Sequence, residues 1–333
     1  AITVLDRTPR FLVGAGKTWV MLGERTAEEV TQARAALLEP GVRLVQGEAR
    51  RIDLRARTVA TDGGEVRWDY LVIALGAELN SDAVPGLAAA HTFYTLKGAE
   101  RLQPVLAGFT GGDVAILIPK APFKCPPAPY DAALLLHRFF ADRGRGAAVR
   151  LALYTVEGVP MATAGPEMGA FIRAELVARG IGFFPQKTVA RVDVAARRIE
   201  FADGAVAPCD LLIHVPPHEA PAVVREAQLT NPAGWVPVDP RTLEVKHAGA
   251  TGRVFAVGDI TAVPLPGRFK PEVPLALPKA GVMAAAHGVV AAQHIAARIL
   301  GTPTDATFDG KGFCYLETGG GAAVKADGNF FAL

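Results

Sequence analysis

Apolar residues along the chain fall into short continuous runs that alternate with longer stretches of helical spacing. The runs are residues 69–74, 114–118, 149–154, 211–215 and 253–257; residues 114–118 are entirely apolar, and each of the others contains a single charged residue or histidine. The stretches with helical spacing are residues 28–38, 130–143, 165–179 and 280–300. Strands without polar positions are typical of parallel sheets buried on both faces, and alternation with helices is typical of βαβ units. The pattern therefore predicts an α/β fold with parallel sheets.

Composition and charge narrow the class of protein. The 333 residues are enough for about two domains. Hydrophobic residues make up 50% and charged residues 20%, which excludes a disordered chain. The net charge of +2 provides no basic surface for a nucleic acid. No uncharged apolar run reaches the length of about 18 residues that predicts a transmembrane helix.

The two ends of the sequence lack the features of natural termini. The chain opens in a β-branched run, Ile2 to Leu5, with neither an initiating Met nor a signal-peptide pattern. It stops as abruptly at Leu333. We therefore interpret the sequence as the interior of a longer protein.

A proline-rich loop, residues 119–129, joins an apolar run to a predicted helix where a dinucleotide-binding domain would have a glycine-rich turn. Prolines remove amide donors, so this loop is a poor cradle for a diphosphate. It carries Cys125 close to a helix start, with Lys120 and Lys124 nearby. Both features favour the thiolate, so we predict a lowered pKa and a reactive thiol. A buried, unreactive loop cysteine is the alternative.

The other two cysteines are Cys209 and Cys314. Three cysteines are too few for a disulfide-stapled scaffold and too widely spaced for a zinc site. Cys209 precedes a buried run and is expected to be a core residue. Cys314 begins an apolar strand, and sequence spacing alone does not show whether it meets Cys125.

A short motif near the start, Gly14-Ala15-Gly16-Lys17-Thr18, resembles the end of a phosphate-binding loop. The full loop needs another glycine where the chain has Phe11, and no apolar strand immediately precedes the motif. We therefore expect a glycine-rich surface turn and no nucleoside triphosphate site.

Three segments together resemble the pyridine nucleotide-disulfide oxidoreductases, flavoproteins with two dinucleotide-binding domains. They are residues 69–76 (Asp-Tyr-Leu-Val-Ile-Ala-Leu-Gly), 254–259 (Val-Phe-Ala-Val-Gly-Asp) and 278–281 (Pro-Lys-Ala-Gly). Residues 121–130 are similar to the cysteine loop of sulfide:quinone oxidoreductases and of the flavoprotein subunit of flavocytochrome c sulfide dehydrogenase. Residues 229–239 also resemble this flavoprotein subunit of the sulfide dehydrogenase. The likeness covers about residues 1–320.

This resemblance implies two Rossmann-like domains and an incomplete C-terminal α+β piece. The FAD-binding domain would comprise residues 1–108 and 236–303, without the first βα unit and its glycine-rich turn. Residues 109–235 would form the second Rossmann-like domain. Residues 304–333 would begin the C-terminal interface or acceptor region.

The resemblance also implies contacts with the adenosine and diphosphate parts of FAD. Asp6, with Arg7 beside it, would hold the adenosine ribose. Ala49 would contact the adenine through its backbone. The segment from Ala74 to Gly76 would pass close to the diphosphate. Taken alone, an acid after a strand is usually a cap or a solvated residue.

A second group of implied contacts lies toward the flavin ring. Gly258 lets the backbone approach a ligand, and Asp259 would bind the ribityl chain. The helix start formed by Lys279, Ala280 and Gly281 would face the pyrimidine edge of the flavin, where its free amides and positive dipole suit an anion. From the residues alone, a turn acid and ordinary helix initiation remain open.

The implied reaction is the oxidation of sulfide to sulfane sulfur or polysulfide, with Cys125 and Cys314 as the redox pair beside the flavin. Sulfide attacks the disulfide or polysulfide bridge, and two electrons enter FAD. The third cysteine found in many sulfide:quinone enzymes is missing, which favours the two-cysteine scheme of the sulfide dehydrogenases. The longer segment from Pro264 to Pro278, with Phe269, is more similar to a quinone enzyme.

We therefore expect a quinone as electron acceptor, with cytochrome c as the alternative. The resemblance also implies a peripheral membrane or periplasmic location, with membrane contact through a C-terminal segment beyond the given residues. Two other functions remain open: an NAD(P)H-dependent flavin reductase of the same fold, and a flavin-binding subunit that has lost activity.

Overall fold

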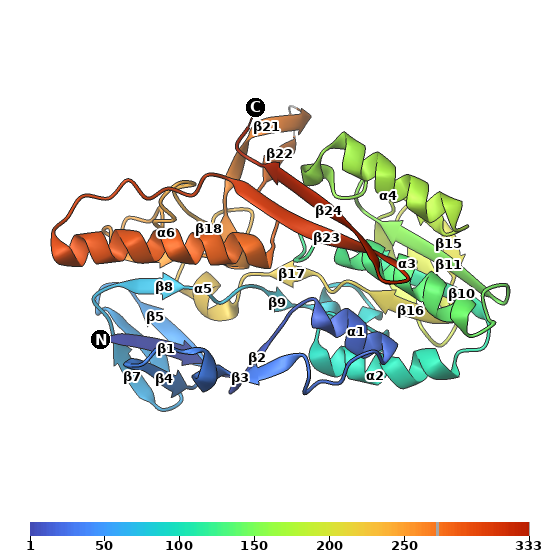
Figure 1. The fold of residues 1–333 in the computed structure, drawn as a ribbon, viewed down its shortest axis with the longest axis horizontal. Helices are drawn as coiled ribbons and strands as arrows, with labels where there is room; N and C mark the ends of the chain where they lie inside the picture. Colours follow the sequence, from blue (N-terminus) through green and yellow to red (C-terminus); the bar gives the residue numbers. More distant parts are fainter. Residues whose placement is uncertain (271–272, 333) are drawn as a thin grey trace.

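A four-stranded parallel sheet forms the centre of one lobe of the molecule (Figure 1). The computed structural model describes residues 1–270 and 273–332. The strand order in this sheet is β12-β11-β10-β16. The strands are β10 (Gly112–Ile118), β11 (Val149–Thr155), β12 (Gly182–Phe184) and β16 (Leu211–His214). The apolar run 114–118 is buried throughout, as a central parallel strand requires.

The two faces of this sheet pack against different layers. Val114, Ile116 and Ile118 belong to the core that the sheet shares with the helices, whereas Ala115 and Leu117 belong to a second core. The helices are α1 (Gly16–Leu22), α2 (Leu96–Gly108), α3 (Ala128–Asp142) and α4 (Pro166–Ala178). The second core is closed by an antiparallel sheet of β13 (Val189–Asp193), β14 (Arg198–Phe201) and β15 (Val206–Pro208). Cys209 is buried in this core, as expected.

The other lobe contains two separate pairs of parallel strands. β1 (Ile2–Asp6) pairs with β4 (Val42–Gln46), and β8 (Leu71–Ile73) pairs with β19 (Val254–Ala256). Within the described residues, no sheet hydrogen bonding joins the two pairs. An antiparallel sheet of β5 (Ala49–Asp53), β6 (Thr58–Thr61) and β7 (Gly64–Arg67) lies beside them. The long helix α6 (Gly281–Leu300) closes the lobe and ends at Gly301, in the left-handed conformation.

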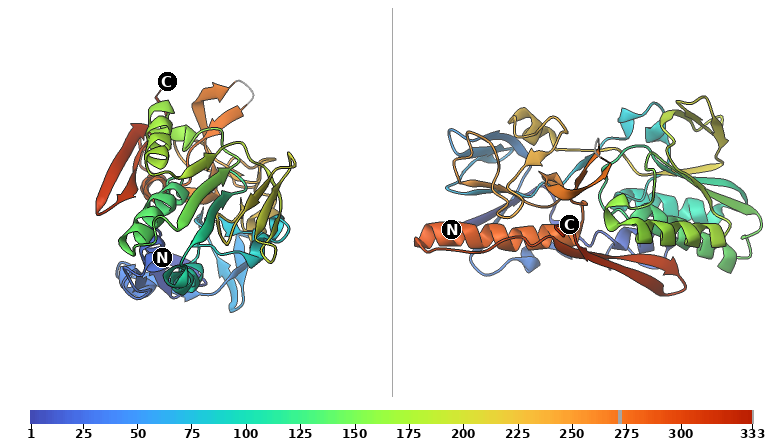
Figure 2. Two further views of the ribbon diagram at one scale, coloured as in Figure 1. Left: turned by 90° about the vertical axis from the view of Figure 1, so that its right-hand side faces the viewer. Right: turned by 90° about the horizontal axis from the view of Figure 1, so that it is seen from above.

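A hairpin near the C-terminus connects the two lobes. Its strands are β23 (Lys311–Gly319) and β24 (Ala322–Asn329), and β23 packs against both α6 and α3. Figure 1 shows the hairpin crossing from beside the start of α6 to the helices of the other lobe. Figure 2 shows the same hairpin from two further sides. Cys314 therefore lies on the strand that crosses between the two lobes.

Short elements complete the chain. They are β2 (Arg10–Leu12), β3 (Thr31–Ala33), β9 (Glu78–Leu79), β17 (His218–Glu219), β18 (Val236–Pro237), β20 (Thr261–Ala262), β21 (Pro264–Lys270), β22 (Val273–Ala276), α5 (Ala222–Glu226), and the 3-10 turns η1 (Arg34–Leu37), η2 (Ser81–Ala83), η3 (Leu87–Ala89), η4 (Ala162–Ala164) and η5 (Gly258–Ile260). The segment from Pro264 to Pro278 is a hairpin of β21 and β22. Residues 271–272 and the side chain of Phe269 lie outside the described part.

The predicted helix over residues 28–38 is wrong. The structure has strand β3 there, paired with β2, followed by the 3-10 turn η1. The Thr31 hydroxyl accepts a hydrogen bond from the Arg10 side chain at 2.9 Å. Pairing with a distant strand overrides the local helical spacing.

The predicted surface turn over residues 14–18 is wrong in its second half. Helix α1 begins at Gly16, which is buried against Val30. A Cβ atom at Gly16 would lie 2.7 Å from a Val30 methyl carbon, so only glycine allows this contact. The motif therefore anchors a helix and does not form an exposed loop.

Candidate functional site

The loop that carries Cys125 is fastened to the segment before helix α6. The Cys125 backbone N–H donates to the Lys279 carbonyl oxygen at 2.8 Å, and Lys124 forms a parallel bridge with Lys279. Cys125 has a φ of 55°, an uncommon conformation for a residue with a side chain. Backbone strain of this kind is often stored at functional sites. The structure therefore brings Cys125 to the start of α6, where the sequence placed the flavin edge.

Cys314 lies on β23, across from the Cys125 loop. Both cysteines are half-buried against the same core, and each is close enough to Asp131 of α3 for the carboxyl group to affect its pKa. The Glu317 backbone N–H donates to Asp131 Oδ1 at 3.0 Å, which ties β23 to α3. In the part of the chain that the structure describes, all three cysteines are free. Both cysteines therefore lie in the surroundings of one buried acid, Asp131.

The predicted lowering of the Cys125 pKa is wrong for the free thiol. Burial raises the pKa of Cys125 to about 12, and Asp131 raises it further, while the Lys17 ammonium group lowers it. Burial also raises the pKa of Cys314 to about 11. Ionisation of either thiol is therefore unfavourable unless neighbouring positive charges stabilise the thiolate.

Asp131 is a buried acid with a raised pKa. Burial raises its pKa well above the ordinary value, the bond from Glu317 N–H lowers it, and the nearby Glu317 carboxylate raises it again. The direction of this shift favours the protonated form of Asp131 relative to an exposed carboxyl group. A protonated carboxyl group beside two thiols can deliver and recover protons.

Lys279, which the sequence assigned to the flavin edge, is buried and makes contacts within the chain. Its ammonium group donates to the backbone carbonyl oxygens of Asp259 and Thr261, and it lies 3.4 Å from the centre of the Trp235 ring. Burial lowers its pKa to about 8, and the Asp259 carboxylate raises it. The lysine therefore fixes the segment between β19 and α6 and places positive charge there.

Asp259 lies between two lysines. Burial raises the pKa of its carboxyl group, while Lys279 and Lys124 lower it. Beside it, the Gly258 backbone N–H donates to His287 Nδ1 at 3.2 Å. A Cβ at Gly258 would lie 2.8 Å from the Ala284 Cβ, so glycine permits α6 to pack here. Gly258, Asp259 and the start of α6 thus lie close together.

Two glycines leave open backbone at this edge of the fold. A Cβ at Gly76 or at Gly281 would meet no atom within 4 Å, and Gly76 has a φ of 65°. The Val257 N–H donates to the Ile73 carbonyl oxygen at 3.0 Å, so the segment from Ala74 to Gly76 follows directly beside Gly258. Open glycine backbone, a carboxylate and a helix start fit the diphosphate, ribityl and ring parts of FAD.

Three residues were expected to contact the adenosine: Asp6, Arg7 and Ala49. They lie in or beside β1 and β5, in the lobe that α6 closes. Asp6 Oδ1 accepts hydrogen bonds from the Thr8 N–H and hydroxyl at 2.7 Å, and its other oxygen lies 3.0 Å from Arg34. Arg7 is exposed and pairs with Glu48 at 3.3 Å. Ala49 pairs with Thr61 in the antiparallel sheet. No contact in the described residues links these three positions to the cysteine site.

Sequence reasoning missed a second buried acid behind the Cys125 loop. The Tyr130 hydroxyl donates to Glu157 Oε2 at 2.6 Å, and the Thr155 hydroxyl lies 3.4 Å from the same oxygen. Burial raises the Glu157 pKa to about 7. Glu157 follows β11, where a dinucleotide-binding domain places its ribose acid, so its position was a readable signal. Its carboxylate is instead engaged by a helix side chain.

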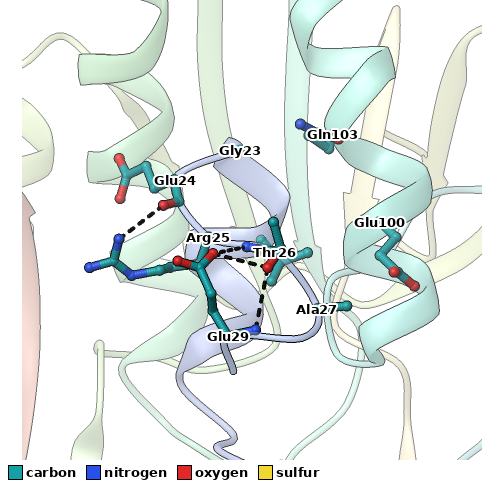
Figure 3. Close-up of a pocket in the computed structure, with 9 residues that line it drawn as sticks. Gly23, Glu24, Arg25, Thr26, Ala27, Glu29, Glu100 and Gln103 are labelled. Atoms are coloured by element: carbon teal, nitrogen blue, oxygen red, sulfur yellow. Dashed lines mark hydrogen bonds between the residues drawn. The ribbon is translucent and has the colours of Figure 1, made fainter. Parts of the chain in front are cut away.

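The hollow shown in Figure 3 lies away from these groups. It has a volume of about 300 Å³ and is lined by the turn after α1 and by Glu100 and Gln103 of α2. The Glu29 carboxylate accepts from the Thr26 N–H at 2.7 Å, and the Thr26 hydroxyl accepts from the Glu29 N–H at 3.3 Å. These bonds stabilise the turn, and the residues that line the hollow include no cysteine, histidine or lysine.

Two structural features are absent from residues 1–270 and 273–332. No helix in this part of the chain combines the length and apolar character needed to cross a bilayer. Nor does any cluster of three or more potential ligands in the same residues suit a metal ion.

Comparison with known proteins gives a family and several relatives. The family model described as pyridine nucleotide-disulphide oxidoreductase matches residues 1–289. The chain is 26% identical over 262 residues to the mitochondrial sulfide:quinone oxidoreductase of Mus musculus, which covers 74% of this chain and 57% of that protein. It is 23% identical over 332 residues to the Schizosaccharomyces pombe enzyme of the same name, covering 95% and 67%. The chain thus spans little more than half of the mouse protein.

The fold is similar to that of a solved sulfide:quinone oxidoreductase from Aquifex aeolicus. The TM-score is 0.85 at 22% sequence identity, over 99% of this chain and 81% of the other. At this identity the likeness concerns the fold, which confirms the predicted α/β architecture with Rossmann-like domains.

Proposed function

The chain belongs to the pyridine nucleotide-disulphide oxidoreductase family, and we propose that it oxidises sulfide at Cys125 and Cys314 and passes the electrons through FAD to a quinone. Members of this family are FAD-dependent flavoproteins. The observation that carries the proposal is the hydrogen bond from the Cys125 N–H to the Lys279 carbonyl, 2.8 Å long, at the start of α6. It puts a cysteine loop at the edge expected for the flavin, with Cys314 and a buried acid beside it.

The proposed reaction begins with the two cysteines joined as a disulfide. Hydrosulfide, HS⁻, attacks the Cys314 sulfur, the bond between the cysteines breaks, and Cys125 leaves as a thiolate. Cys314 then carries a persulfide, –SSH, so atoms and charge balance. FAD, when bound beside the pair, supplies the acceptor for two electrons. Closing the bridge as a trisulfide releases these two electrons and one proton.

Two groups of this chain would serve these steps. The Asp131 carboxyl group raises the pKa of both thiols, and we assign to it the transfer of a proton to an opened thiolate and the recovery of one when the bridge closes. Cys125 is held at the α6 start by its own backbone N–H, so its sulfur stays at one place through the cycle. Burial keeps water from competing with hydrosulfide for the bridge.

Quinone is the proposed acceptor because the relatives named above are sulfide:quinone oxidoreductases. We expect steady-state turnover of sulfide with a soluble short-chain quinone to exceed turnover with cytochrome c by at least about tenfold. The measurement is sulfide consumption by one FAD-loaded preparation with each acceptor in turn. Faster turnover with cytochrome c would reverse the assignment of the acceptor.

A further inference from the structure

A buried tryptophan lies over the ammonium group of Lys279. Trp235 and Lys279 are each only 6% exposed, and the Lys279 nitrogen lies 3.4 Å from the centre of the Trp235 ring. Trp235 directly precedes β18, which pairs in parallel with β20, and the register places Val236 opposite Thr261. Sheet pairing therefore holds the tryptophan beside β20, the strand that directly follows the turn η5.

The Lys279 ammonium group joins this tryptophan to the turn η5. It donates to the Asp259 carbonyl oxygen and, at 3.4 Å, to the Thr261 carbonyl oxygen, while the Trp235 ring face lies against the same cation. A cation–π contact is strongest when the cation is removed from water, as it is here. The ring therefore fixes the ammonium group at the position from which it holds both carbonyls.

The same lysine holds the cysteine loop through its backbone. Its carbonyl oxygen accepts a hydrogen bond from the Cys125 N–H at 2.8 Å. At the far end of η5, the Thr261 hydroxyl donates to the Gly258 carbonyl oxygen at 2.7 Å, which closes the turn that carries Asp259. One lysine thus ties together the turn after β19, the start of α6 and the cysteine loop.

We propose that Trp235 is a positioning residue for FAD that acts through Lys279: its ring holds the ammonium group, and the ammonium group holds the turn η5 against the cofactor. This inference rests on the proposed function, in which Gly258 and Asp259 of that turn contact FAD. It gives Trp235 no contact with the flavin and no part in the sulfur chemistry. Because the tryptophan acts through the cation, its effect on FAD should vanish once the cation is removed.

The test measures how fast FAD leaves the loaded protein after dilution, from the rise in free-flavin fluorescence, with neither sulfide nor a quinone present. Trp235→Leu is expected to accelerate release about tenfold, because it keeps an apolar side chain but removes the ring face. Trp235→Phe retains a ring face and should stay within about threefold of the wild-type rate. Trp68→Leu is the matched control: Trp68 packs against the same core as Trp235, and its replacement should not alter release.

A double-mutant cycle separates the action of the cation from simple packing. Lys279→Met should accelerate release at least as much as Trp235→Leu, and adding Trp235→Leu to Lys279→Met should change the rate by less than about twofold. Equal acceleration by Trp235→Leu with and without the lysine, or an unchanged rate in either single variant, would overturn the proposal. Should the leucine variant fail to fold, Trp235→Met takes its place. Because release of FAD needs neither sulfide nor an acceptor, the result is independent of whether the cysteines oxidise sulfide.

Discussion

Replacing Cys125 by serine is expected to reduce the rate of sulfide-dependent flavin reduction at least about 10³-fold, the scale of losing a nucleophilic residue. Serine keeps the backbone N–H that donates to Lys279, so the loop stays in place. It removes the sulfur that must leave as a thiolate and later close the bridge. The measurement is stopped-flow absorbance of FAD-loaded protein mixed with sulfide in the absence of oxygen.

Cys314→Ser is expected to cause a loss of the same size, because the two sulfurs act as one unit. Cys209→Ser provides the control, since Cys209 is buried in the core behind the β13–β15 sheet. This third variant should keep its rate per folded, FAD-loaded molecule. Full sulfide-dependent reduction in both the Cys125 and the Cys314 variants would remove the cysteine pair from the mechanism.

Asp131→Asn is expected to lower the rate of sulfide-dependent flavin reduction by about 10²-fold, the usual contribution of a positioned proton-transfer group. Asparagine keeps an oxygen for the bond from the Glu317 N–H but cannot exchange a proton with the sulfurs. In the wild-type protein the rate should fall as the pH rises and Asp131 loses its proton, because its pKa is raised. The variant should lack this part of the pH profile.

Asp142→Asn is the matched control for this prediction. Asp142 lies near the end of the same helix, where its exposed carboxylate pairs with Arg138 at 2.8 Å. Its replacement should leave the rate and the pH profile unchanged. If Asp131→Asn reacted at the wild-type rate with the same profile, Asp131 would have a structural role only, fastening β23 to α3.

The α/β fold could be predicted because its central strands carry a strong local signal. The run 114–118 has no polar residue, and it became the buried strand β10. Helices α3, α4 and α6 were predictable from apolar spacing and from the glycines that end them. The segment 28–38 was not, because its structure depends on pairing with β2, and no local pattern records a partner elsewhere in the chain.

The sequence could single out candidate site residues but could not predict their electrostatics. Cys125 could be singled out because a cysteine among prolines and lysines stood where a glycine-rich turn belongs. The sign of its pKa shift could not, because burial and Asp131 act through space. The packing of β23, which carries Cys314, against both α3 and α6 is a long-range contact that no local pattern records.

The most direct test of the central claim is an anaerobic titration of the FAD-loaded protein with sulfide, followed by absorbance. The account predicts that sulfide bleaches the yellow flavin band, that a long-wavelength charge-transfer band appears, and that peptide mass spectrometry finds added sulfur on Cys125 and Cys314. NADH should not bleach the flavin at a comparable rate. A flavin that sulfide leaves oxidised, or one that sulfide reduces equally well in the Cys125→Ser, Cys314→Ser double variant, would contradict the account.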